Sequence, residues 1–565
     1  MTTTQIRTPI LIVGGGPVGL ALAGDLAWRN VPSLLIERGD GTVDQPKMDL
    51  VSVRTMEYCR RWGIVSAVEN SPYPRDYPQD YVWVTALTGF ELGREPFPPK
   101  DDEATPLQSP QKRERCPQDM FDPILQKWVR TMPLAQTRYR CEVLEITESE
   151  EGVWAIARDL ETGETFEVLA DYAVGCDGAA STVRAALGQT LEDIPALTYT
   201  TNVIFRSEDL DTLHDKGPAY RYIFIGPGGT EATLVAINGA DRWRFSIVGT
   251  PEKQDVSDEE IERAIVHAVG RHFDFEIISV VKWARREMVA KTFGRRRMFV
   301  AGDAAHLMSP TGGFGMNTGI GDAVDLAWKL AARHEGWGGE HLLESYEAER
   351  RPVAVRNVTE ASSNLGRMLS ARSSLPPAAV FEAGPEGDAA RLEFGAWYTA
   401  MMRPEWFTIG IHLGYRYDPS PICVDDGTPA PVDEVMTYEQ TARPGSRAPH
   451  VWLADGSSTL DLFGRTFVLL RIVAGVGAFR PNVDDFVGAA AEVGLPLRLV
   501  DVDDPNVAAA YGKPLVVVRP DGHVAWRGDL VPSDSRAVID TIRGASSSAD
   551  ASRAIDSHSA ARSNA

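Results

Sequence analysis

The sequence predicts an α/β fold that contains an inserted antiparallel sheet and is followed by a second, smaller α/β domain. Three observations lead to this prediction. The apolar run PILIV (9–13) enters a glycine-rich turn, as a buried parallel strand before a helix does. Alternating segments such as YRYIFIG and RWRFSIVG recur between residues 195 and 290 and are typical of antiparallel strands. Strand-like runs then return after a Pro-rich composition change near 425–447.

The other elements are predicted from the spacing of apolar residues. Helical spacing predicts helices over 17–30, around 43–70, over 119–133, from Asn317 onward and through most of 340–410. Buried or alternating runs predict a strand over 33–36 and a hairpin leading into a strand that ends at Cys176. Residues 71–118 are Pro-rich and carry few periodic signals.

The composition is that of a soluble globular chain and excludes several classes of partner. The 565 residues include 57 Lys and Arg against 79 Asp and Glu, a net charge of −22. A balance this acidic argues against nucleic acid and against an anionic membrane surface as partners. Five scattered cysteines without a C-x-x-C pair predict a cytoplasmic protein without disulfides, and no metal-ligand set is visible. Glycines and a proline interrupt the uncharged run 8–24, so we expect no membrane span there.

The glycine-rich turn has the spacing of a nucleotide-binding βαβ unit. Gly14 would make the tight turn, Gly16 would let the backbone approach a pyrophosphate, and Gly19 would let the helix pack on the strand. The helix N-terminus offers free N–H groups to phosphates. An acidic residue at the end of the next strand suits the ribose hydroxyls. The residues expected at the nucleotide are therefore Gly14, Gly16, Pro17, Gly19, Glu37 and Arg38.

Two distant motifs decide between NAD(P) and FAD. One is GCDGAASTVR, residues 175–184, and the other is GDAAHLMSPTGGFGMN, residues 302–317. With the glycine-rich turn and SYEAERRPVA (345–354), they resemble the class A flavoprotein monooxygenases, the family built like p-hydroxybenzoate hydroxylase. The resemblance is strongest to the phenol-hydroxylase branch, which carries a C-terminal thioredoxin-like domain without redox cysteines. The run KPLVVVRPDGHVAWR fits that domain.

This resemblance implies FAD as the cofactor, with NAD(P)H and O₂ as cosubstrates. NAD(P)H would reduce the flavin, O₂ would form a C4a-hydroperoxide, and its distal oxygen would pass to a phenolic or polyketide-like aromatic molecule. Asp303 would cap the ribityl–pyrophosphate region, and Asp177 would serve both the FAD and the NAD(P)H approach. The helix that begins near Asn317 would point its positive end toward the flavin. The turn against the isoalloxazine would contain Pro310, Gly313, Gly315, Met316 and Asn317.

The strand and helix patterns, the composition changes and the resemblance together predict the boundaries of the domains. The FAD-binding domain would combine two separated segments with parts of 71–118 that face the substrate side, and the last residues would form a disordered tail. The expected ranges are 1–190 and 285–360 for the FAD-binding domain, 191–284 for the substrate sheet, 361–440 for a helical connector and linker, 441–543 for the thioredoxin-like domain and 544–565 for the tail.

Asp49 is the candidate catalytic residue, because it stands where some relatives have a His near the substrate. As a carboxylate it could take a phenolic proton if burial raised its pKa. The alternative is a turn or capping Asp before the helix at 52–62. Lys47 stands where relatives usually carry Arg and would lose the bidentate flavin contact. Gln118 matches a Gln beside FAD, and its alternative is an ordinary helix N-terminal position.

Aromatic residues of the inserted sheet, with two tyrosines of GYRYDPSP, are candidates for the substrate wall. Core packing is the alternative for aromatic residues in strands. The candidates are Tyr220, Tyr222, Phe224, Tyr415 and Tyr417.

Other functions stay open beside aromatic hydroxylation. The same scaffold supports Baeyer–Villiger oxygen insertion, an FAD dehydrogenase that reduces a quinone, or a non-catalytic flavin-binding protein that docks through its C-terminal domain. The sequence also leaves open the identity of the substrate, whether the electron donor is NADH or NADPH, and whether the protein is a monomer or a homodimer.

Overall fold

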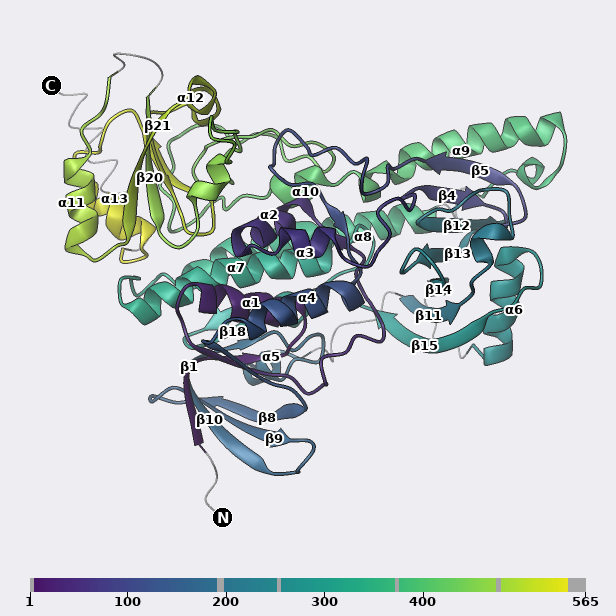
Figure 1. Cartoon of the computed structure of the whole chain (residues 1–565), viewed down its shortest axis with the longest axis horizontal. Helices are drawn as coiled ribbons and strands as arrows, with labels where there is room; N and C mark the ends of the chain where they lie inside the picture. Colours follow the sequence, from purple (N-terminus) through teal and green to yellow (C-terminus); the bar gives the residue numbers. More distant parts are fainter. Residues whose placement is uncertain (1–4, 191–197, 251–255, 371–374, 474–478, 547–565) are drawn as a thin grey trace.

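The computed structural model describes residues 5–190, 198–250, 256–370, 375–473 and 479–546. An eight-stranded, a seven-stranded and a four-stranded sheet form the main layers, and two short strand pairs connect them. Figure 1 shows the four-stranded sheet and the seven-stranded sheet at opposite ends of a helical layer. This confirms the predicted fold class, an α/β chain with an inserted sheet and a small C-terminal α/β domain.

The eight-stranded sheet contains the N-terminal strand and is mostly parallel. Six of its strands have the order β17–β18–β10–β1–β2–β7. The other two form a branch in which β9 pairs with β10 and β8 pairs with β9. The inner strands are buried on both faces, as parallel strands covered by helices are. The strands are β1 (Gln5–Val13), β2 (Ser33–Ile36), β7 (Ala135–Arg138), β8 (Cys141–Glu148), β9 (Val153–Asp159), β10 (Thr165–Gly175), β17 (Gly294–Arg295) and β18 (Met298–Val300).

Helices cover this sheet, and α1 packs against both α4 and α7. Nearly every residue of α1 is buried, which explains its almost continuous apolar sequence. The helices of this layer are α1 (Pro17–Trp28), α2 (Val53–Trp62), α3 (Val65–Glu69), α4 (Gln118–Arg130), α5 (Thr182–Ala186), α7 (Phe314–Glu335) and α8 (Glu344–Ser370).

Two details differ from the predicted elements. The helix expected from Asn317 begins at Phe314, because Gly313 adopts φ 69° and turns the chain into the helix there. The helical segment expected over 43–70 is two short helices, preceded by an extended stretch in which β3 (Leu50–Val51) pairs with β6 (Glu114–Arg115).

The seven-stranded sheet has the order β15–β11–β14–β13–β12–β4–β5 and is antiparallel except between β12 and β4. Helix α6 (Asp258–Val269) packs on one face, where it shares an apolar core with the sheet. The residues 71–118 supply two of its strands, which are too short to show a clear alternating pattern, and β4 is buried along its whole length. The strands are β4 (Tyr81–Val84), β5 (Glu91–Glu95), β11 (Thr198–Arg206), β12 (Arg221–Gly226), β13 (Gly229–Ala236), β14 (Arg242–Thr250) and β15 (Glu276–Arg285).

The opposite face of this sheet turns toward the rest of the molecule. Helix α9 (Pro385–Trp406) packs on β5 and on α8, and α10 (Ile409–Leu413) packs on α2. The short pair β16 (Met288–Val289) and β19 (His306–Leu307) joins the inserted sheet to the first sheet.

The C-terminal unit is a mixed sheet in the order β21–β20–β22–β23. Helices α11 and α13 pack on one face and α12 on the other. Part of the tail expected from residue 544 is packed, because His341 N donates to Gly544 O at 2.9 Å. Residues 547–565 lie outside the described residues. The elements are β20 (Phe467–Val473), β21 (Leu497–Asp503), β22 (Leu515–Val518), β23 (Val524–Gly528), α11 (Asp484–Glu492), α12 (Pro505–Tyr511) and α13 (Ser535–Ile542).

Within the described parts of the chain, no helix has both the length and the apolar character that crossing a bilayer requires. The same residues contain no group of three His, Cys, Asp or Glu side chains arranged to hold a metal ion.

Candidate functional site

The glycine-rich turn lies between β1 and α1, and its three glycines have different surroundings. A Cβ on Gly14 would lie 2.4 Å from Cys176 O, and a Cβ on Gly19 would lie 2.0 Å from Gly14 O. These two glycines therefore let strand, turn and helix pack. A Cβ on Gly16 would meet nothing within 4 Å. The open space at Gly16, directly before the first turn of α1 at Pro17, is where a phosphate can approach the free N–H groups.

Glu37 follows β2 and faces this turn. Its Oε2 accepts a hydrogen bond from Gly15 N at 2.6 Å, and its Oε1 accepts one from Gly39 N at 2.6 Å. The structure thus brings the predicted carboxylate beside the glycine-rich turn, whereas the neighbouring Arg38 side chain is exposed.

The segment 302–317 meets the same helix N-terminus. A Cβ on Gly302 would lie 2.9 Å from the Val18 side chain of α1, and a Cβ on Gly319 would lie 2.9 Å from Gly302 Cα. Only glycines permit this approach between α1, α7 and the turn η2 (Gly302–Ala304). The Asp303 side chain is exposed at this junction.

Asn317 joins the predicted flavin turn to the segment behind Asp49. Its Oδ1 accepts hydrogen bonds from Ser52 N at 2.9 Å and from Thr55 Oγ1 at 2.8 Å. Its Nδ2 donates to Gly313 O at 2.9 Å. The rest of the turn stays accessible, with Pro310 exposed and Gly313, Gly315 and Met316 half-buried.

Two other predicted cofactor residues are held by local hydrogen bonds. Gln118 is the first residue of α4, and its Oε1 accepts from Lys47 N at 3.0 Å. The Lys47 side chain itself is exposed. Asp177 Oδ2 accepts from Thr182 N at 2.7 Å, at the start of α5, whose N-cap residue is Ser181.

Together these residues fit FAD. The bare Cα of Gly16 leaves room for a pyrophosphate, Glu37 presents a carboxylate, and Asp303 is exposed where α1 and α7 meet. The residues that would hold the cofactor are therefore contributed by three separated segments of the chain.

Asp49 lies in a hydrogen-bonded cluster with Tyr220 and Arg244. Tyr220 Oη donates to Asp49 Oδ2 at 2.9 Å, and Arg244 Nη2 donates to the same oxygen at 2.6 Å. Arg244 also donates to Pro46 O at 3.0 Å, which fixes the loop that carries Asp49.

The protonation state of Asp49 corrects the sequence-based prediction. Burial opposes its charge, but Arg244, Arg115 and the Tyr220 hydrogen bond outweigh burial and hold the pKa of Asp49 below its usual value. The raised pKa required of a neutral-pH base is therefore absent. The capping alternative is also wrong, because Ser52 accepts from Thr55 N and caps α2.

Arg115 completes the cluster and was missed by sequence reasoning. Its guanidinium carbon lies 3.4 Å from the centroid of the Tyr220 ring, and its Nε donates to Gln79 Oε1 at 3.3 Å. It is 2% exposed and forms no ion pair with any described residue. No motif marks this position, which is brought beside Asp49 by the pairing of Leu50 with Arg115.

The sheet face toward this cluster carries polar side chains beside apolar ones such as Val235, which packs in the apolar cluster under α9. The ladder pairs Arg221 with Val235 and Val235 with Arg244, so the two arginines lie in one row on the same face. In a neighbouring row, Thr233 pairs with Ser246 and Ser246 with Asn202. This face can therefore bind polar groups of a ligand.

Tyr222 and Phe224 lie on the opposite face, in the apolar core under α6. Their position favours core packing over the predicted role in the substrate wall. Tyr415 and Tyr417 make their contacts near the C-terminal unit, where the Tyr417 ring packs at a tilt against His523 with ring centroids 4.3 Å apart. Of the five aromatic candidates, Tyr220 is the one that contacts Asp49.

Arg285, at the end of β15, is a second buried cation without a carboxylate partner among the described residues. It is 7% exposed, and its Nη1 donates to Ser309 Oγ at 3.4 Å, next to Pro310 of the predicted flavin turn. Burial, with repulsion from Arg221, lowers the pKa of Arg285 to about 10 although Glu405 and Glu287 lie nearby. This cation is therefore poorly compensated within the protein.

Two family models match the chain. The model described as FAD binding domain matches residues 7–361, and the one described as Aromatic-ring hydroxylase, C-terminal matches residues 441–546.

Characterised relatives match over nearly the whole length. The chain is 33% identical to the FAD-dependent monooxygenase apdD of Emericella nidulans over 94% of this chain and 88% of the relative. It is 32% identical to the 4-methyl-5-nitrocatechol 5-monooxygenase of a Burkholderia species over 96% of this chain and 98% of the relative. The solved structure of RebC with bound 7-carboxy-K252c is 38% identical, has a TM-score of 0.88 and covers 96% of this chain and 100% of that one.

Proposed function

The chain belongs to the family of FAD-dependent aromatic-ring hydroxylases, and from this premise we propose that it uses O₂ to hydroxylate a phenolic ring bound at Asp49, Tyr220 and Arg244. It is a flavoprotein monooxygenase that takes its electrons from NAD(P)H. The observation that carries the proposal is the Tyr220–Asp49 hydrogen bond of 2.9 Å, beside a sheet face that also presents Arg221 and Arg244.

FAD, when bound, supplies the redox chemistry that activates oxygen. The protein's own part is to orient the ring and to stabilise negative charge on its phenolic oxygen. Tyr220 keeps its proton and donates a hydrogen bond to Asp49, so a lone pair of its hydroxyl oxygen is free to accept a hydrogen bond from the substrate hydroxyl. Arg115 and Arg244 supply positive charge where phenolate character develops, and such preorganised charge is a main source of rate acceleration.

We assign the domains as the sequence predicts, with β4 and β5 added to the substrate sheet. FAD would lie between segments 1–190 and 285–360, and the substrate between FAD and the sheet face that carries Arg221 and Arg244. A reducing cytoplasm is the location that the free cysteines support.

A panel of aromatic compounds tests the function directly. Protein purified with FAD should oxidise NAD(P)H faster when a suitable phenol is present, consume O₂ and release a hydroxylated product. The panel should contain simple phenols, catechols and polyketide-like phenols. Oxygen-independent dye reduction without hydroxylated product would favour the dehydrogenase alternative, and an oxygen-inserted ring would favour Baeyer–Villiger chemistry.

Within this function, the poorly compensated charge of Arg285 favours a substrate that carries an anionic group. Arg285 lacks a carboxylate partner among the described residues, whereas Asp49 stabilises the charge of Arg115, and Arg221 and Arg244 are paired with Glu405 and Asp49. A buried charge without a partner is costly, and a carboxylate on the ligand would offset that cost.

Arg285→Met should lower kcat/KM for a hydroxylated aryl carboxylate by about 10- to 100-fold, because a charged hydrogen bond contributes roughly that factor. The neutral amide of the same compound should be affected much less. Steady-state kinetics on the matched pair measure the difference, and Arg285→Lys should recover part of it. An equal loss on both compounds, or a weaker affinity for FAD, would assign Arg285 to the flavin instead.

A further inference from the structure

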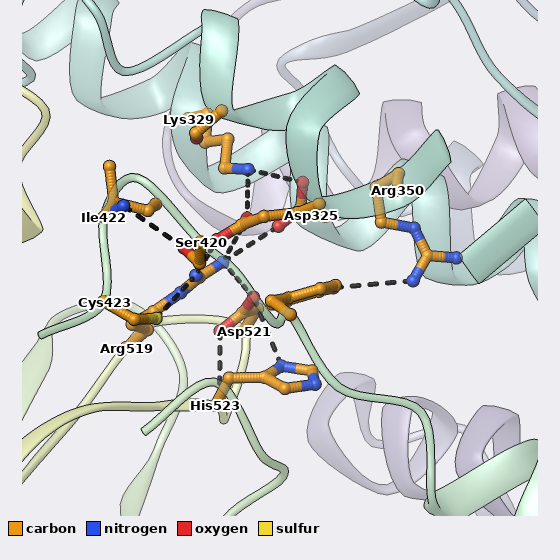
Figure 2. Close-up of polar contacts among 12 residues, drawn as sticks. Asp325, Lys329, Arg350, Ser420, Ile422, Cys423, Arg519, Asp521 and His523 are labelled. Atoms are coloured by element: carbon orange, nitrogen blue, oxygen red, sulfur yellow. Dashed lines mark hydrogen bonds and ion pairs between the residues drawn. The ribbon is translucent and has the colours of Figure 1, made fainter. Parts of the chain in front are cut away.

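A buried ionic cluster joins the C-terminal unit to α7 and α8 (Figure 2). Its centre is Arg519, in the loop between β22 and β23, whose side chain is fully buried. Arg519 Nη2 lies 3.0 Å from Asp325 of α7 and 3.0 Å from Glu349 of α8. It also pairs with Asp521 of its own loop at 2.7 Å. One guanidinium thus holds two helices of the FAD-binding part.

The cluster has two cations and three carboxylates. Lys329 of α7 reaches Asp325 at 2.7 Å and Glu349 at 2.6 Å. Arg519 and Lys329 hold the pKa of Glu349 low against the effect of burial, whereas burial raises the pKa of Asp325. Because no charge of this cluster reaches water, each carboxylate depends on these two cations.

The contacts continue from this cluster to the predicted cofactor site. Asp322 lies one helical turn before Asp325 and accepts from Gly302 N at 3.1 Å and from His306 Nε2 at 2.7 Å. Arg350, next to Glu349 on α8, donates to Asp322 at 2.8 Å. Asp322 therefore holds the segment that carries Asp303. Asp322 and its partner Arg350 lie on the same two helices as Asp325 and Glu349, which bind Arg519.

An apolar contact supports the same connection. Trp328 and Trp337 belong to the same buried cluster as Phe467 and Phe486 of the C-terminal unit. The Trp328 and Phe467 ring centroids are 5.9 Å apart. The C-terminal unit therefore packs directly on the helix whose other end begins at the flavin turn.

We propose that the C-terminal domain contributes to FAD binding. Arg519 is a positioning residue that holds α7 and α8 so that segment 302–317 can bind FAD. The domain without redox cysteines thus acts on the cofactor through structure rather than thiol chemistry. Arg519 would act on the flavin site through Asp325, Glu349 and their helix neighbours.

The test measures FAD affinity and the midpoint potential of bound flavin in full-length variants. Arg519→Met should weaken FAD binding by about tenfold, within the range of coupling found in buried networks, and should shift the potential. Arg519→Lys, which keeps the charge but replaces the planar guanidinium with a single ammonium, should give a smaller loss. Arg60→Met is the matched control, because Arg60 pairs at 2.7 Å with Asp461 of the C-terminal unit near the surface. It should leave both readouts unchanged.

A double variant separates positioning from a mere excess of buried negative charge. Arg519→Met with Glu349→Gln restores the charge balance but lacks the link, so stability should recover while FAD affinity stays low. Recovery of both, or wild-type affinity and potential in folded Arg519→Met, would overturn the proposal. If Arg519→Met does not fold, Arg519→Lys and the double variant test the proposal. Wild-type FAD affinity and midpoint potential in both of these variants would overturn the proposal.

Discussion

Gly16→Val should produce a folded protein that no longer binds FAD. Gly16 has φ −72° and ψ −176°, an extended conformation that valine adopts readily. A Cβ there would meet no protein atom within 4 Å, so the protein alone should keep its stability to within about 0.5 kcal/mol. The branched side chain would instead fill the space through which the pyrophosphate reaches the N-terminus of α1. We expect the affinity for FAD to fall by at least about 10³-fold, or about 4 kcal/mol.

Thermal unfolding of the apoprotein measures its stability. Flavin fluorescence during titration measures the affinity for FAD. Gly19→Val is the informative comparison, because its Cβ would lie 2.0 Å from Gly14 O. That variant should lose the fold itself, whereas Gly16→Val should lose the cofactor alone. A yellow, flavin-loaded Gly16→Val protein would show that the pyrophosphate does not bind at this turn.

The difference between these two glycines illustrates what the sequence can and cannot predict. The G-x-G-x-x-G spacing identifies all three glycines, because a local turn is specified by residues close in sequence. The spacing does not tell which glycine faces a ligand and which faces the protein. That depends on Cys176, which the parallel pairing of β1 with β10 brings beside Gly14.

The substrate side was predicted less well, for a physical reason. Arg115 and Arg244 come from strands far apart in sequence, and an arginine in a strand carries no local signal of function. Tyr220, Tyr222 and Phe224 are spaced by two residues, which predicts one common face. Tyr220 precedes the first residue of β12, so the alternation does not extend to it, and its hydroxyl reaches Asp49 instead.

The ionic cluster around Arg519 was also not predictable. Asp325 and Lys329 are four residues apart and would be read as an ordinary surface pair on a helix. Only the packing of the C-terminal unit shows that both are buried and meet an arginine 194 positions away from Asp325.

Tyr220→Phe should reduce hydroxylation by roughly 10²-fold or more while the flavin is still reduced by NAD(P)H. The change removes the hydroxyl through which Asp49 would act on the phenolic oxygen, but Asp49 keeps its ion pair with Arg244 at 2.6 Å. Oxygen would still be consumed, so we expect reducing equivalents to appear as hydrogen peroxide instead of product. The ratio of product formed to NAD(P)H oxidised measures this loss of coupling.

Tyr222→Phe is the matched control, because Tyr222 Oη donates to Gly217 O and its ring packs in the core on the other face of the sheet. It should keep wild-type coupling, and equal coupling in both variants would contradict the placement of the phenol at Tyr220.

The pH dependence sharpens the same prediction. Since Arg244 and Tyr220 hold the pKa of Asp49 below its usual value, Asp49 remains ionised throughout neutral pH. A general base would add a limb to the pH–rate profile at its own pKa, whereas an ionised partner of Tyr220 adds none. Asp49→Asn should therefore lower the rate at every pH between about 6 and 9 without moving the limb set by the substrate phenol. A limb that disappears in Asp49→Asn would restore Asp49 as the base, and unchanged rates would remove it from the site.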